Sequence, residues 1–139
     1  MKALLKAVKA ELETSAALSV CASGGIYAGR AAPGASVPYL VWTRRPARPP
    51  QHSTGGIVVE RATLRFEAFS TSALAAAEAA VQVGKLFIGA PPALESGSLI
   101  QVAKVRDGLS IERGVAGGGE EVWRASIDLE FMIERNLDG

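Results

Sequence analysis

Residues 121–135 carry the feature that most constrains the fold, an alternation of apolar and polar residues with period two. Its apolar positions are Trp123, Ala125, Ile127, Leu129, Phe131 and Ile133. Its polar positions are Arg124, Ser126, Asp128, Glu130 and Glu134, and Met132 is the exception. Successive side chains of a strand point to opposite faces, so this pattern predicts a long β-strand with one buried face. Such a strand is central to a sheet, or projects beyond it as one arm of a hairpin.

Two earlier segments are also predicted to be strands. Residues 57–69 alternate in the same way, which is typical of a half-buried antiparallel strand. Residues 39–43 are β-branched and aromatic, and Pro38 before them is tolerated at the first position of a strand.

Residues 98–115 are predicted to form a hairpin. Leu99–Val105 would be one arm and Leu109–Val115 the return, because Asp107-Gly108 between them is a strong signal for a two-residue turn. The three glycines at 117–119 are predicted to form a flexible joint before the last strand.

Two helices complete the predicted order. The first, at residues 2–19, has one apolar stripe made of Leu4, Leu5, Val8, Leu12 and Ala16. The second, at residues 71–87, is rich in alanine and can be capped by Ser70 or Ser72. We therefore expect an α+β fold in the order α-β-β-α-β-β-β. An antiparallel sheet of about five strands would pack against two helices.

Length and composition exclude several classes of protein. A chain of 139 residues, 48% of them hydrophobic, fits one domain over residues 1–139 with a real core. One cysteine and one histidine exclude an internal disulfide and a two-histidine metal centre, and we expect no cofactor, metal or catalytic residue. The net charge of +1 makes sequence-specific DNA binding improbable, and no apolar run reaches the ~20 residues that span a bilayer.

The charges are nevertheless unevenly distributed along the chain. Residues 1–106 carry twelve basic and six acidic residues, a net of +6, whereas residues 107–139 carry three basic and eight acidic, a net of −5. Such a split can produce complementary faces on neighbouring subunits. The alternative is that neighbouring strands neutralise each other within the fold.

Six residues are the candidates for contact with a partner. Arg44, Arg45, Arg48 and His52 lie in the proline-rich segment 44–56, which is expected to be a long exposed loop. They could bind phosphate or an acidic partner, or could simply keep the loop soluble. Asp128 and Glu130 share the polar face of one strand, roughly 7 Å apart. A glycosidase pair can have that spacing, but nothing supplies the burial that would raise one pKa, so a solvated face is the favoured interpretation.

The succession of segments also resembles a known family. A helix with an apolar stripe precedes Gly25-Ile26-Tyr27, and Val37-Pro38-Tyr39-Leu40-Val41-Trp42 follows a small loop. The alternating strand from Ala62 to Phe69 then leads through Ser70 into the alanine-rich helix, and the strand from Trp123 to Phe131 closes the chain. This order over nearly the whole chain resembles the tail-completion or tail-terminator proteins of long-tailed bacteriophages, prophages and gene-transfer particles.

The resemblance implies a structural virion protein and no enzyme. Members of that family form a ring, usually a hexamer, that caps the head-proximal end of the tail tube after assembly in the host cytoplasm. The ring stops polymerisation of the tube protein and meets the head-completion connector. Three alternatives remain: another head–tail connector or minor tail protein, a small-ligand or peptide-binding module outside any virus, and an enzyme.

Overall fold

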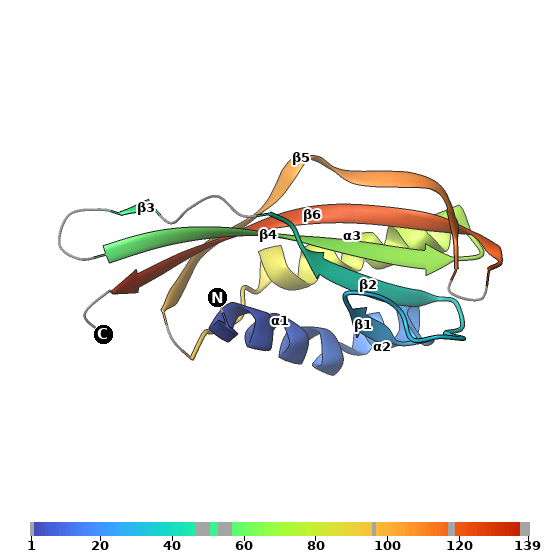
Figure 1. Cartoon of the computed structure of the whole chain (residues 1–139), viewed down its shortest axis with the longest axis horizontal. Coiled ribbons are helices and arrows are strands. Elements are labelled where there is room, and N and C mark those ends of the chain that lie inside the picture. Colours follow the sequence, from blue (N-terminus) through green and yellow to red (C-terminus); the bar gives the residue numbers. More distant parts are fainter. Residues whose placement is uncertain (1, 47–50, 53–56, 96, 117–118, 137–139) are drawn as a thin grey trace.

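The fold is built on two long antiparallel strands, β4 (Ile57–Ser70) and β6 (Glu121–Asn136), that pair without interruption from Ile57↔Asn136 to Ser70↔Trp123. The computed structural model (Figure 1) describes residues 2–46, 51–52, 57–95, 97–116 and 119–136. The remaining elements are, in chain order, α1 (Lys2–Thr14), α2 (Ala16–Cys21), β1 (Ile26–Ala28), β2 (Tyr39–Arg44), β3 (Gln51–His52), α3 (Ala73–Gly89) and β5 (Ser98–Val115).

One sheet contains all the described strands. Its order is β1-β2-β4-β6-β5, and β3 pairs separately with the start of β4. All neighbours are antiparallel except β1, which runs parallel to β2. The α+β class is therefore confirmed, but the sheet is mixed and gains two short strands that the sequence pattern did not indicate.

The predicted hairpin at residues 98–115 is wrong. These residues form the single edge strand β5, which pairs with β6 along most of its length. The pairing jumps from Lys104↔Leu129 to Leu109↔Ile127, so Asp107 and Gly108 lie in an irregularity where β5 has extra residues. Extra residues of this kind bend a strand, and Figure 1 shows β5 arching at its middle. The actual hairpin connects β5 to β6 through residues 116–120.

The helices differ from the prediction mainly at their ends. The single helix expected at 2–19 is divided at Ser15, whose Oγ accepts a hydrogen bond of 3.2 Å from the amide of Leu18 and so caps α2. The second predicted helix is confirmed as α3, where Ser72 Oγ accepts from the amide of Ala75 at 3.3 Å.

The main core lies between one face of the sheet and the three helices. It joins Leu4, Val8 and Leu12 of α1 to the buried side chains of β4, β6 and α3. Phe87 of α3 stacks on Phe66 of β4 and meets Phe131 of β6 edge to face. Gly84 of α3 is buried against the sheet, and a Cβ there would be in ordinary contact with Ile127 Cδ1 at 3.4 Å.

The opposite face of the sheet is largely open. A small cluster covers one end of it, with Tyr39, Val41, Ala116 and Val122 buried beneath the segment around Val37. Most of the remaining positions of β4 and β6 on this face are polar and half-buried, and Val59 and Met132 are the apolar exceptions. The two faces thus confirm the alternation that the sequence showed for residues 57–69 and 121–135.

Candidate assembly surfaces

Four described residues of the basic segment 44–56 are paired with or hydrogen-bonded to β4, namely residues 44, 45, 51 and 52. Arg44 ends β2 opposite Leu64, and the amide of Arg45 donates a 2.8 Å hydrogen bond to the carbonyl of Thr63. The backbone of β3, including His52, pairs with Val58 and Val59. These four described residues therefore lie along β4, where the sequence predicted only a loop.

The four basic candidates are described to different extents. Arg44 and Arg45 are exposed. Only the backbone of His52 is described, and Arg48 lies outside the described residues. Figure 1 shows β3 and the adjoining ends of β4 and β6 extending beyond the helices, so this part of the sheet projects from the body of the molecule.

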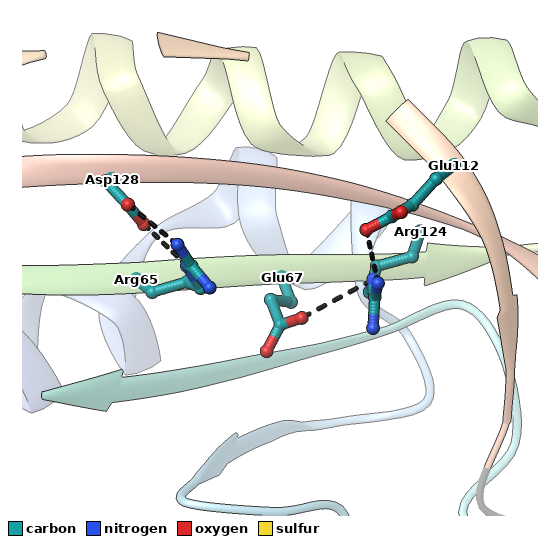
Figure 2. Close-up of polar contacts among 5 residues, drawn as sticks. All are labelled: Arg65, Glu67, Glu112, Arg124 and Asp128. Carbon is teal, nitrogen blue, oxygen red and sulfur yellow. Dashed lines mark hydrogen bonds and ion pairs between the residues drawn. The ribbon is translucent and has the colours of Figure 1, made fainter. Parts of the chain in front are cut away.

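Asp128, one of the acidic candidates, binds Arg65 within the same chain (Figure 2). The two residues are directly opposite in the β4–β6 pairing. Arg65 Nε donates to Oδ1 at 2.8 Å and Nη2 donates to Oδ2 at 3.0 Å. This hydrogen bonding raises the pKa of Arg65 above its ordinary value, as a guanidinium stabilised by a carboxylate should behave.

A second ionic group links three strands on the same open face. Arg124 of β6 forms an ion pair with Glu67 of β4, with Nε and Oε2 3.5 Å apart, and its Nη2 contacts Oε1 of Glu112 on β5. Figure 2 shows Arg124 placed between the two carboxylates. The charges of Glu67, Glu112 and Asp128 are therefore balanced by arginines on neighbouring strands. For these three residues this agrees with the second interpretation of the uneven charge, that neighbouring strands neutralise each other.

Glu130 differs from Asp128 although only one residue separates them. It is half-buried and lies opposite Thr63 on β4 and Ala103 on β5. Among the described residues no ion-pair partner reaches it. Of the two acidic candidates, Glu130 is thus the one whose charge is not already matched in this part of the chain.

The two edges of the sheet are unlike each other. β5 is an 18-residue edge strand, and no described strand pairs with its outer side. Along it, Leu109, Ile111 and Val115 are exposed. The opposite edge is the three-residue strand β1 followed by a turn. A long unpaired edge with apolar side chains favours pairing with another chain.

Sequence reasoning missed the residues that complete these ionic groups. Arg65, Glu67 and Arg124 were recognisable as polar positions, but their partners depend on the register of three strands. The role of Glu112 was also missed, because the sequence placed this residue in the return arm of a predicted hairpin, whereas it lies opposite Arg124 in the single strand β5.

No three histidine, cysteine, aspartate or glutamate side chains of the described residues are grouped to hold a metal ion. None of the described helices is both long and apolar enough to cross a membrane.

Comparison with known proteins gives one family and one fold. The model of a family described as "Tail completion protein gp17" matches residues 6–134. No curated protein matches the chain. A solved structure described as "Virion of native gene transfer agent (GTA) particle" contains a similar chain, with a TM-score of 0.72 and 20% sequence identity. The match covers 96% of each chain, and at this identity it shows a shared fold.

Proposed function

This chain belongs to the tail completion protein gp17 family, and from that premise we propose that it closes the head-proximal end of a phage tail tube as a ring. The family makes it a structural protein of the virion tail. The ring would cap the last ring of tube protein, stop polymerisation of the tube and offer its other face to the head-completion connector. The observation that carries the proposal is the family match over nearly the entire chain.

The unlike edges of the sheet support a ring. A closed ring needs heterologous contacts, in which one surface of a subunit meets a different surface of the next. The long free edge of β5 and the opposite edge at β1 and β2 are two such surfaces, because they lie at the two ends of the strand order. A contact of this kind would continue the sheet from subunit to subunit.

The distribution of exposed charge supports the same arrangement. Glu120 and Glu121 are exposed at the turn between β5 and β6. Arg30, Arg44 and Arg45 are exposed on the side of β1 and β2. The edge strand β5 itself carries exposed charges of both signs, at Lys104, Glu112 and Arg113. The acidic turn and the basic side of β1 and β2 would attract each other if the ring brought them together.

Charge reversal of the basic segment tests the proposal. Arg44→Glu, Arg45→Glu and Arg48→Glu are combined, and the particle mass is measured by light scattering, alone and with tube protein. The expected result is a folded protein whose ring formation is lost or strongly weakened. The matched control combines Lys2→Glu, Lys6→Glu and Lys9→Glu on α1, which changes the net charge equally on a different surface. If both variants form rings equally well, the basic segment is not part of the contact that forms the ring.

The wild-type measurement tests the ring itself. A ring of about six copies, or one that forms only with tube protein, is expected. A chain that stays monomeric and ignores tube protein at high concentration would contradict the proposal. A ring that binds a head connector but not tube protein would instead identify a different joining protein of the particle.

A further inference from the structure

The outer face of α3 carries a regular apolar stripe that the core does not use. Leu74, Val81 and Ile88 follow one another at intervals of seven residues, and their exposed fractions are 69%, 40% and 38%. An interval of seven residues keeps side chains on nearly one line of a helix. The helix residues that pack on the sheet, such as Val83 and Phe87, lie on the other side. Leu74 is therefore mostly exposed in the single chain, whereas Val81 and Ile88 each leave somewhat more than a third of their surface exposed.

Two opposite charges lie within the same stripe. Glu78 and Lys85 are both exposed and are also seven residues apart, one in each interval between the apolar residues. At this separation they are almost two helical turns apart, too far to form a pair within the helix. Neither has an ion-pair partner among the described residues.

Along α3 the stripe reads apolar, acidic, apolar, basic, apolar, so it can pair with a second copy of itself that runs in the opposite direction. Leu74 lies seven residues before Val81 and Ile88 lies seven after, while Glu78 and Lys85 lie three before and four after. If a second α3 is laid antiparallel with both copies of Val81 at the centre, each Leu74 faces Ile88 of the other copy. Each Glu78 then lies opposite residue 84 of the other copy, one residue from Lys85, which is about 1.5 Å along the axis and within reach of the long side chains. A two-fold axis thus satisfies all five positions with one surface, as an isologous contact requires.

Apolar side chains of β5 extend the surface beside the helix. Leu109 and Ile111 are opposite Ile127 and Ala125 of β6, which belong to the helix-covered core, so they project on the side of the sheet that carries α3. Both are exposed.

We propose that α3 docks antiparallel on α3 of a second copy of this chain, about a two-fold axis near Val81. The contact is distinct from the heterologous edge contact proposed for the ring. A 17-residue helix is only about 25 Å long. One such helix on each side buries less than the ~800 Å² per partner of a standard interface, so the dimer is weak and reversible.

A charge exchange tests the pairing. Dimerisation of the purified chain is followed by sedimentation equilibrium from low micromolar to about 1 mM, without tube protein. Glu78→Lys and Lys85→Glu each place like charges opposite one another twice in the dimer and should each weaken it about tenfold. The double variant restores both pairs with reversed sign and should regain wild-type affinity. Circular dichroism is expected to show unchanged folding because both residues are exposed.

Cross-linking tests the position of the axis. In a Cys21→Ala background, Val81→Cys lies near the axis and should form a disulfide-linked dimer on oxidation. Leu74→Cys is the matched control, because two copies of residue 74 lie about 21 Å apart in this arrangement and should not link. An equal mixture of Leu74→Cys and Ile88→Cys should link to each other.

Three outcomes would overturn the inference. They are a wild-type chain that stays monomeric at the highest concentration, a double charge variant as weak as the single ones, and equal cross-linking at residues 74 and 81. Each can occur while the ring still forms on tube protein, so failure here is distinguishable from failure of the proposed function.

Discussion

Arg65 on β4 and Asp128 on β6 lie directly opposite each other, and the guanidinium donates two parallel hydrogen bonds to the carboxylate, of 2.8 and 3.0 Å. The pair sits near the middle of the uninterrupted pairing between β4 and β6. It connects one of the acidic residues singled out by the sequence to a basic residue 63 positions away.

Removing the carboxylate should destabilise the protein modestly. Asp128→Ala is expected to lower the free energy of unfolding by about 1 kcal/mol, because the pair is bidentate but partly solvated, with side-chain exposures of 34% and 24%. Urea unfolding measures the change. Glu130→Ala is the control on the same strand and face, and should have a smaller effect. If both variants lose the same free energy of unfolding, the ion pair between Arg65 and Asp128 adds nothing to stability beyond what an unpaired acidic residue on this strand provides.

The aromatic centre of the core should be far more sensitive. Phe87 is 0% exposed, and its ring centroid lies 5.5 Å from that of Phe66 and 5.6 Å from that of Phe131. Phe87→Ala leaves a cavity between α3 and the sheet and should cost about 3–5 kcal/mol in unfolding experiments. Val20→Ala, at a side chain that is 77% exposed, should change stability by less than about 0.5 kcal/mol. Comparable losses in the two variants would contradict the assigned core.

Two glycines should respond oppositely to alanine. A Cβ on Gly24 would lie 1.6 Å from the carbonyl oxygen of Ser36 and 2.7 Å from that of Pro38, both of them backbone atoms. Gly24→Ala should therefore cost more than about 2 kcal/mol, because the segment at residues 36–38 must move. Gly89, at the end of α3, has open space around it, and Gly89→Ala should be neutral or stabilising by up to about 1 kcal/mol. Thermal unfolding of the two variants decides the point, and a Gly24→Ala variant as stable as wild type would refute this packing.

The free edge of β5 should matter for assembly and not for folding. Ile111→Lys places a charge on an exposed position of the edge strand, which discourages another strand from pairing there. We expect an unchanged unfolding midpoint and weaker ring formation on tube protein, measured by light scattering. Val20→Lys adds the same charge at another exposed apolar residue and should leave the ring intact. Undiminished assembly by the Ile111 variant would exclude this edge as the contact proposed for the ring.

The elements that the sequence predicted well are those with a long uniform period. The strands at 57–69 and 121–135 keep their alternation over many residues, and the structure buries the expected faces of β4 and β6. The second helix was equally clear, because alanine has the highest intrinsic helix propensity and this segment is rich in it. The resemblance of the ordered segments to tail-completion proteins is confirmed by the family match.

The errors occur where a local signal competes with pairing over a distance. Asp107-Gly108 is a strong turn signal, but β6 offers partners on both sides of it, so β5 continues through an irregularity. β1 has only three residues and no alternation from which to recognise it. The ionic partners of Asp128 and Arg124 depend on the register of β4, β5 and β6, and a shift of one residue would separate them. Whether Arg44, Arg45, Arg48, His52, Asp128 and Glu130 contact a partner stays a prediction.

The anchoring of the basic segment to β4 has a mechanical consequence. Arg45 is tied to Thr63, and β3 is tied to Val58 and Val59, so a pull on this segment along the strand direction passes directly into β4. β4 is in turn paired with β6 over its whole length. Force along such a pair loads many hydrogen bonds at once in shear instead of peeling them apart singly. A pull applied at residues 45, 51 and 52 would therefore be shared among the hydrogen bonds of the whole β4–β6 pair.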